Sequence, residues 1–261
     1  MWSGKRVSII FPTFNEKDSI ADCIEEFFHL PYVDDILVVD NNAAPGTVEE
    51  VVRTYARIVH EPRQGYGWAI RQGMEKTDGD LVVICEPDGT FVPDDLEKLL
   101  AYTKDFDIVY GSRTLGWMIW ERANMGWFLR LGNIVVAKMI EVLFNCRSLS
   151  DVGCTFRVLR REVSDFLLPH YRVSGSDFGP EMMLRSVLAS CRVVQIPVNY
   201  RRRVGVSSVT GDPFKAFILG MRMIFMILSF RLGSLLRMQR YVMPAYRLSK
   251  APESVEPKSV G

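Results

Sequence analysis

The stretch Asp80-Leu-Val-Val-Ile-Cys-Glu-Pro-Asp-Gly-Thr-Phe91 decides the fold. Leu81 to Cys85 is a continuous apolar run with adjacent β-branched residues, which is typical of a central strand buried on both faces. The run ends at Glu86-Pro-Asp-Gly89, where proline removes a backbone donor and glycine permits a tight turn. Open α/β sheets bind ligands at the carboxyl ends of their strands, so this turn delivers two carboxylates to a binding edge. Paired carboxylates suit Mg²⁺ or Mn²⁺ together with substrate phosphates; an acidic strand-to-helix turn without a metal is the alternative.

Short apolar runs alternate with segments of helical spacing along the rest of the first half. The apolar runs predict further strands at 7–11, 36–39, 58–60 and 108–110, and the helical spacing predicts helices at 19–30, 46–55, 66–74 and 94–102. This alternation predicts βαβ units, and therefore an α/β fold with a mostly parallel sheet flanked by helices. Unusual polar and glycine residues follow the carboxyl ends of the predicted strands: Pro12 to Glu16, Asp40, Gly65, Asp88 and Arg113. Because they gather on one edge of the sheet, we expect that edge to be the binding face.

Composition and cysteine usage narrow the class of protein. A net charge of +1 over 261 residues gives no electrostatic argument for a nucleic-acid partner. The five cysteines include no CxxC pair, so we expect reduced thiols and neither a zinc site nor a disulfide framework. The first strand follows directly after Met-Trp-Ser-Gly-Lys-Arg6, which leaves no room for a signal peptide. These features predict that the protein faces the cytoplasm; with the segments described next, the expected location is the cytoplasmic face of a membrane, as a peripheral or interface-associated protein.

Two later segments predict contact with a membrane surface. The segment 114–145 contains Trp117, Trp120 and Trp127 among interspersed charges, which favours an amphipathic element in a membrane interface over a core helix. In the segment 212–246 only eight residues separate Arg222 from Arg231, too few to span a bilayer, so an interfacial helix is expected. The predicted organisation is a catalytic domain at 1–211 that includes 114–145, an amphipathic membrane-associated helical segment at 212–246, and a disordered tail at 247–261.

Several groups of residues stand in a fixed order along the chain. They are Phe11-Pro-Thr-Phe-Asn-Glu16, Val38-Val-Asp40 with Gly46-Thr47, Gln64-Gly-Tyr-Gly67 with Gly73-Met74, the acidic turn at 86–88, Gly111-Ser-Arg113 and Asp151-Val-Gly-Cys-Thr-Phe-Arg157. In this order they resemble the family-2 glycosyltransferases, and most closely the dolichyl- and polyprenyl-phosphate sugar synthases. The resemblance covers residues 5 to about 210.

The resemblance implies a GT-A fold (Rossmann-like) and inverting transfer of a hexose from a UDP- or GDP-linked sugar, with Mg²⁺ or Mn²⁺ as cofactor. The residues that it assigns to the nucleotide sugar are Pro12, Phe14, Glu16, Asp40, Gln64 and Gly65, with Asp40 accepting hydrogen bonds from the base. The residues that it assigns to the metal are Glu86, Asp88 and Thr90. Glu86 stands where an aspartate is usual, and its longer side chain would suit contact through water.

The resemblance also assigns the arginines. Arg203 matches the arginine near the sugar diphosphate, and Arg113 and Arg130 match the pair that holds the lipid phosphate, so the catalytic set is Asp88, Arg113, Arg130 and Arg203. The serine expected four residues after Arg130 is Ile134. The alternative for Arg113 is an ion pair with an aspartate on the sheet edge.

The acceptor is expected to be a polyprenyl or dolichyl phosphate. A phosphate monoester, with a second pKa of about 6, is already an anionic nucleophile at neutral pH and needs positioning only. A hydroxyl acceptor would need a general base, for which Asp151 and Asp177 are candidates. Two alternatives stay open: transfer to a hydroxyl of a lipid-linked or soluble glycan, and a nucleotide-sugar-binding protein without catalysis. The donor base and sugar, and whether the chain forms a homo-oligomer, are also open.

Overall fold

Seven strands form one mixed sheet with helices on both faces. The computed structural model describes residues 1–121, 123, 126–146, 149–205 and 213–236. The strands are β1 (Val7–Thr13), β2 (Asp35–Asp40), β3 (Arg57–His60), β4 (Leu81–Ile84), β5 (Ile108–Ser112), β6 (Arg157–Arg160) and β7 (Val193–Pro197). Their order in the sheet is β3-β2-β1-β4-β6-β5-β7. All neighbours pair in parallel except β6, which runs antiparallel to β4 and β5.

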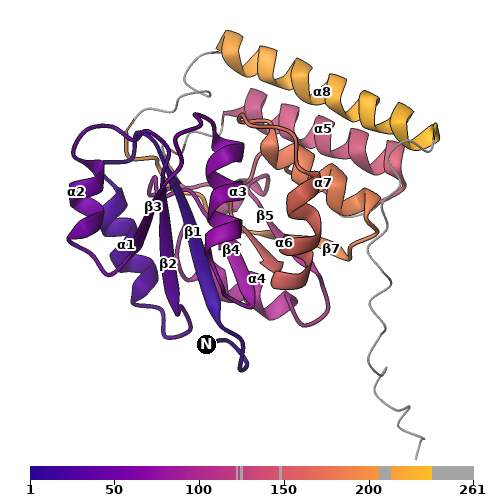
Figure 1. The fold of residues 1–261 in the computed structure, drawn as a ribbon. Helices are drawn as coiled ribbons and strands as arrows, with labels where there is room; N and C mark the ends of the chain where they lie inside the picture. Colours follow the sequence, from indigo (N-terminus) through magenta and orange to yellow (C-terminus); the bar gives the residue numbers. More distant parts are fainter. Residues whose placement is uncertain (122, 124–125, 147–148, 206–212, 237–261) are drawn as a thin grey trace, which may run out of the picture.

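Each face of the sheet is covered by its own set of helices, as Figure 1 shows. Buried residues of α1 (Ile20–Phe28), α2 (Thr47–Val52) and α4 (Asp95–Tyr102) pack on one face. Buried residues of α3 (Tyr66–Lys76), α5 (Trp127–Phe144), α6 (Arg161–Leu167), α7 (Phe178–Leu188) and α8 (Pro213–Leu235) pack on the other. Two short 3-10 helices, η1 (Gly116–Met118) and η2 (Leu168–His170), complete the elements. The predicted α/β fold with a mostly parallel sheet is confirmed.

The central strand β4 is buried along its whole length, as its continuous apolar run predicts. Its β-branched side chains alternate between the two faces, so one strand supplies both cores: Val82 and Ile84 belong to one, and Leu81 and Val83 to the other. β1 lies beside it in register, with Ile10 opposite Ile84. The turn at 86–89 therefore follows the middle of the sheet, and the other loops of the binding edge surround it.

The strands β6 and β7 are absent from the sequence-based prediction. β6 carries an arginine at each end, Arg157 and Arg160, and such a run appears as a solvated basic cluster in the sequence. In the structure both arginines are buried, Arg157 at 2% exposure. Arg160 donates to the main-chain oxygens of Thr103 and Lys104 instead of facing water. Tertiary hydrogen bonds of this kind leave no periodic signal in the sequence.

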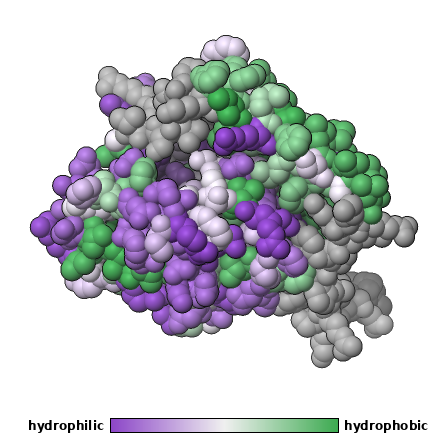
Figure 2. Space-filling model, turned by 45° about the horizontal axis from the view of Figure 1, so that its top comes forward, coloured by the Kyte–Doolittle hydropathy of each residue, from purple (hydrophilic) through white to green (hydrophobic). Residues whose placement is uncertain are grey.

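The helices α5 and α8 lie side by side at the end of the molecule that holds the binding edge (Figure 1). Ala216–Leu235 lies within α8 and is long and apolar enough to cross a membrane by length and composition, and the expectation of an interfacial helix in the segment 212–246 stays a prediction. Trp117, Trp120 and Trp127 are 84%, 50% and 77% exposed, so the alternative that they pack in the core is wrong. Figure 2 shows apolar side chains gathered along the top and right of the molecule, where α5 and α8 lie. The expected disordered tail, 247–261, lies outside the described residues.

Candidate active site

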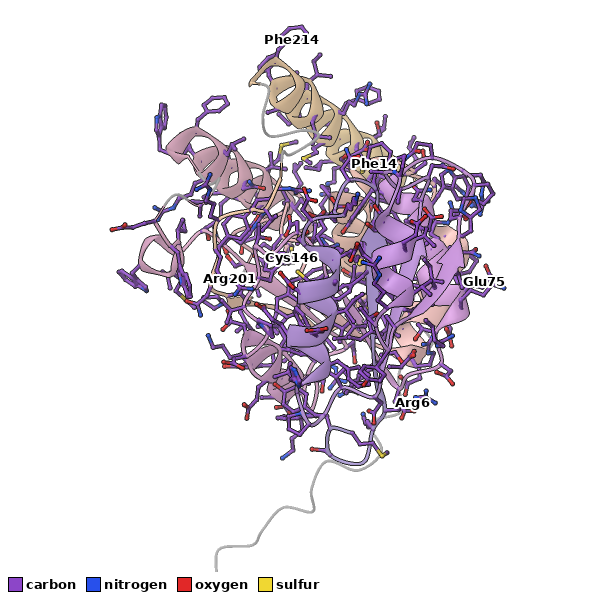
Figure 3. The ribbon with its side chains drawn as sticks, turned by 90° about the vertical axis from the view of Figure 1, so that its left-hand side faces the viewer. Arg6, Phe14, Glu75, Cys146, Arg201 and Phe214 are labelled. Atoms are coloured by element: carbon purple, nitrogen blue, oxygen red, sulfur yellow. The ribbon has the colours of Figure 1, made fainter. Side chains whose placement is uncertain are left out.

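A cavity of about 580 Å³ opens at the carboxyl ends of the strands, and it has two chemically different walls. The polar wall comes from the loops after β1, β2, β3, β4 and β5 and from the chain after β7: Thr13, Glu16, Asn41, Gln64, Glu86, Arg113 and Arg203. The apolar wall comes from α5 and α8 and contains Phe128, Leu129, Val135, Val136, Phe217, Leu219, Met221, Met223 and Ile224. Figure 3 shows Phe14 at the same end of the molecule as α8, with Arg6 at the opposite end. The predicted edge of the sheet therefore lines this cavity.

Arg203 connects the carboxylates at the polar end of the cavity. Its Nη1 lies 2.8 Å from Asp88 Oδ2 and 3.7 Å from Glu86 Oε2, and its Nη2 lies 2.8 Å from Glu16 Oε1. The guanidinium is only 14% exposed, and its Nε is buried without a hydrogen-bond partner. One cation thus faces three acids, which come from the loops after β1 and β4.

The pKa of Glu86 is raised in this environment. Burial is the largest cause and the nearby carboxylate of Asp88 is the second, while Arg203 opposes both, and together they bring the pKa from 4.5 to about 8. Glu86 would therefore hold a proton at neutral pH in the absence of a further cation.

Asp88 is almost completely buried, at 1% exposure, and Thr90 lies behind it. The Oδ1 of Asp88 accepts from the main-chain N–H of Thr90 at 3.0 Å and from its hydroxyl at 2.6 Å. Thr90 is therefore placed to orient Asp88, and neither of these two residues lines the cavity. The assignment of Thr90 as a metal ligand stays a prediction; its hydroxyl donates to the carboxylate of Asp88.

The acid pair at 86 and 88 fits a divalent cation held partly by a substrate. Among the described residues no group of three or more His, Cys, Asp or Glu side chains could hold a metal on its own. Mg²⁺ characteristically binds one or two carboxylates together with substrate phosphates and waters, so a complete protein cage is not required. Three carboxylates surround the single guanidinium of Arg203, so this position carries an excess of acidic groups. Glu86 and Asp88 therefore suit a cation that arrives with a diphosphate.

The loop after β1 is organised by Glu16. Its Oε2 accepts from the main-chain N–H groups of Phe14 and Asn15 at 2.7 and 2.9 Å, while its other oxygen faces Arg203. Phe14 is 41% exposed at the cavity, and Pro12 also lines it. This loop presents an aromatic ring and a fixed carboxylate, which suits a flat heterocycle and a ribose.

The loop after β3 is held by Asn41, which the motif analysis did not single out. Its Nδ2 donates to the main-chain oxygens of Glu61 and Arg63, and its Oδ1 accepts from the N–H of Gly65 at 2.8 Å. Gly65 has φ +143°, and a Cβ there would lie 2.3 Å from the main-chain oxygen of Ser174. Only glycine fits at position 65 because a Cβ would clash there. Gln64 and Gly65 both line the cavity.

Asp40 does not line the cavity. Its Oδ1 accepts from the N–H of Ala43 at 2.8 Å, and its Oδ2 lies 2.9 Å from Nδ1 of His60. His60 lies opposite Asp40 on β3, so the partner could have been found from strand register. A base that donated a hydrogen bond to Asp40 would share its carboxylate oxygens with His60 and the N–H of Ala43.

Arg113 lines the cavity, but its guanidinium is paired with Asp151. Nε and Nη2 donate to the two oxygens of Asp151 at 2.9 and 3.1 Å, and the main-chain N–H of Arg113 adds a third bond at 2.9 Å. The ion pair that the sequence left as an alternative is therefore present. The pair fixes the guanidinium 5.2 Å from the ring centre of Tyr200, another cavity residue.

Arg130 lies outside the cavity wall. An added Cβ at Gly116 of η1 would meet its Nη1 at 3.1 Å, so the guanidinium lies beside η1. Asn133, one turn further along α5, lines the cavity instead. The side chain of Asn133 and the guanidinium of Arg113 both lie against Gly153: a Cβ at Gly153 would lie 2.8 Å from Asn133 Oδ1 and 2.9 Å from Arg113 Nη2. Asn133 immediately precedes Ile134, where the serine of the family pattern is missing, so an amide stands beside the missing hydroxyl.

The family model described as Glycosyl transferase family 2 matches residues 8–168. The chain belongs to this family. The match ends within the η2 segment that follows α6, so it covers six of the sheet's strands and every loop of the polar wall before β7.

Curated relatives extend over most of the chain. An uncharacterized glycosyltransferase of Mycobacterium tuberculosis is 30% identical over 219 residues, covering 83% of this chain and 95% of the relative. A dolichyl-phosphate hexose transferase of Haloferax volcanii is 25% identical over 210 residues, covering 80% of this chain and 87% of the relative. The fold matches glucosyl-3-phosphoglycerate synthase of M. tuberculosis, solved with Mn²⁺, uridine diphosphate and glucosyl-3-phosphoglycerate, with a TM-score of 0.67 at 17% identity over 87% of this chain and 80% of the other.

Proposed function

We propose that this protein is an inverting, metal-dependent hexosyltransferase that moves one sugar from a UDP- or GDP-linked donor to a polyprenyl or dolichyl phosphate at the cytoplasmic face of a membrane. The observation that carries the proposal is the cavity: acids and arginines line one part of it, and apolar side chains of α5 and α8 line the rest. A soluble acceptor would not need such an apolar wall. A lipid with a phosphate head group needs both the polar wall and the apolar wall.

The donor would occupy the polar wall. Phe14 and Pro12 would contact the base, Gln64 and Gly65 would bound the same pocket, and Arg203 would meet the diphosphate. A bound divalent cation at Glu86 and Asp88 would neutralise negative charge that develops on the leaving nucleoside diphosphate. Arg203 contributes to the same task, because its fork can exchange the carboxylate of Glu16 for phosphate oxygens. Solved proteins of the same fold that hold Mn²⁺ and uridine diphosphate support this assignment.

The acceptor phosphate would lie near Arg113 and Asn133, where the polar and apolar walls meet. Its anionic oxygen is already nucleophilic, so these residues would act by positioning. Asp151 is poorly suited to act as a base for a hydroxyl: burial opposes its ionisation, but the adjacent Arg113 guanidinium prevails and keeps the pKa of this carboxyl below its usual value. Its oxygens are also occupied by Arg113 and by the N–H of Gly153. This favours a phosphate acceptor over a hydroxyl acceptor.

The apolar chain of the acceptor would run between α5 and α8 toward the exposed face of these helices. That face carries Trp127, Leu131, Phe217 and Phe225, each at least half exposed. Such a surface suits the interface of a bilayer, where a long-chain lipid phosphate presents its head group. The curated relative named as a dolichyl-phosphate hexose transferase supports the same acceptor class.

Two acceptors that have the same polyprenyl chain but different head groups test the proposal. Purified protein, Mn²⁺ and a panel of UDP- and GDP-sugars would be incubated with a polyprenyl phosphate or with the corresponding polyprenol, which has a hydroxyl in place of the phosphate. The proposal predicts transfer to the phosphate alone. Transfer to the alcohol or to a glycan hydroxyl would support the alternative, and no transfer or hydrolysis with any donor would favour a binding protein.

A further inference from the structure

Two arginines are stacked on a single tryptophan beside the cavity, outside the site described above. The guanidinium carbon of Arg63 lies 3.8 Å from the ring centre of Trp68, and that of Arg71 lies 4.2 Å from the same ring. Trp68 and Arg71 are three residues apart in α3 and share one face of that helix. Stacking of this kind fixes the guanidinium planes while it leaves their N–H groups for other partners.

The charges around Trp68 do not balance. Arg63 is paired with Glu61, with Nε and Nη2 donating at 2.8 and 2.7 Å. Within the described part of the chain, Arg71 has no ion pair and no hydrogen bond. Burial lowers the pKa of Arg71 and the charge of Arg63 lowers it further; Glu181 opposes this effect and Arg172 adds to it. Glu181 cannot serve Arg71 directly, because its oxygens accept from Arg185 and from the main-chain N–H groups of Arg172 and Val173.

The cluster adjoins the apolar surface of α8 through one loop. The N–H of Gly67 donates to the main-chain oxygen of Ser174 at 2.8 Å, which ties the first turn of α3 to the loop 172–177. Gly175 and Ser176 of this loop line the cavity together with α8 residues. Asp177 borders a second hollow on α8, formed with residues that include Phe217, Met221 and Phe225. The loop 172–177 thus lies between the first turn of α3, which adjoins the arginine cluster, and the apolar side chains of α8.

We propose that Arg71, with Arg63 and Arg172, binds the phosphate of an anionic phospholipid headgroup when the apolar face of α5 and α8 rests on a membrane. Arginine offers phosphate a bidentate fork, and the free fork of Arg71 is the group that lacks an anion. A tryptophan next to the cations suits the headgroup level of a bilayer. A free phosphate ion would need the arginines alone; their connection to α8 through the loop 172–177 favours a lipid. The proposal rests on the proposed function only in that both place this face against a membrane.

Vesicle binding tests the proposal. The full chain would be sedimented with vesicles of phosphatidylcholine alone or containing 30% phosphatidylglycerol. Each arginine that binds anionic headgroups contributes about a fivefold change in the partition coefficient. The variant Arg71→Gln/Arg172→Gln should therefore bind the anionic vesicles about 25-fold more weakly than the wild type, and the phosphatidylcholine vesicles equally well. The matched control is Arg6→Gln, because Arg6 lies at the opposite end of the molecule and forms only an exposed pair with Asp78 (Figure 3).

Several other results of the vesicle experiment would contradict the proposal. A loss of about fivefold in Arg6→Gln, the same per charge removed as in the double variant, would overturn the proposal, because net charge alone would then explain the binding. Wild-type-like binding of the double variant would also overturn it, and so would wild-type binding that does not depend on phosphatidylglycerol. A third contrary result would be that inorganic phosphate, but not vesicles, protects Arg71 from a reagent that modifies guanidinium groups. Circular dichroism and binding of uridine diphosphate would verify that the variants are folded. Failure of sugar transfer to polyprenyl phosphate would refute the proposed function and leave this vesicle result standing.

Discussion

Filling the apolar part of the cavity should weaken use of the long-chain acceptor and spare the donor. Gly220 in α8 lines the cavity, and a Cβ built on it would meet nothing within 4 Å. Gly220→Leu would therefore place a branched side chain in the space that the proposal gives to the lipid. The polar wall, with Glu86 and Arg203, comes from other loops and would not be touched.

The size of the effect follows from the groups displaced. A leucine side chain would exclude two to three methylene-sized groups of the acceptor, each worth about 0.8 kcal/mol when buried. The expected loss is about 2 kcal/mol, or roughly 30-fold in the acceptor kcat/KM. The protein itself should gain up to about 1 kcal/mol, because glycine is a poor helix former. Gly220→Ala is the matched control, since it makes the same gain in helix propensity and adds a single methyl group.

The assay would measure transfer with a long-chain polyprenyl phosphate and with a short, water-soluble analogue. Gly220→Leu should lower kcat/KM for the long chain, leave the short analogue and the donor KM near wild type, and melt no lower than Gly220→Ala. An equal rise in donor KM, or long-chain kinetics that match those of Gly220→Ala, would refute the assignment of the apolar wall to the acceptor.

Three other changes test the residues assigned to the metal and the acceptor phosphate. Asp88→Asn should reduce transfer at least 10³-fold with an unchanged far-ultraviolet circular dichroism spectrum, because the amide keeps the bonds to Thr90 and loses the charge; turnover near wild type would remove the metal role. Arg130→Ala should raise the acceptor KM more than the donor KM, as expected of a residue near the acceptor path, and equal effects on both would contradict that placement. Without metal, the free energy of unfolding should fall as pH rises from about 5 to 8, since Glu86, with its pKa raised to about 8, holds a proton in the folded protein that the unfolded chain has already lost. Urea unfolding across this range would measure the slope, which should be smaller in Glu86→Gln; parallel curves for the two proteins would contradict the raised pKa.

The strands of the binding edge could be predicted from sequence because their signal is local. The apolar run of β4 and the proline and glycine that end it fix both a buried strand and the turn after it. The same argument places the loops after β1, β3 and β5 on one edge, where they line one cavity. β6 could not be found this way, because Arg160 is buried against the main-chain oxygens of Thr103 and Lys104, which come from a distant part of the chain.

The hydrogen-bond and ion-pair partners of the site residues could not be predicted from the sequence, for a related reason. Sequence motifs indicate which residue types the site contains, whereas the hydrogen bonds and ion pairs between side chains depend on which loops lie next to each other in the fold. Asp40 is bound by His60 across two strands, and Arg113 is bound by Asp151, which is 38 residues away along the chain. Asn133 lines the cavity and Arg130 does not, because the guanidinium of Arg130 lies beside Gly116 of η1. The sequence thus predicts the edge and most of the loops, and the structure decides which side chains face the ligand.

The mass of the lipid product tests the central claim most directly. Wild-type protein and Asp88→Asn would each be incubated with Mn²⁺, a panel of UDP- and GDP-hexoses and a polyprenyl phosphate, and the extracted lipid would be analysed by mass spectrometry. The account predicts polyprenyl phosphate carrying one added hexose with the wild type and none with Asp88→Asn. Unmodified lipid with every donor, or the same product from both proteins, would contradict it.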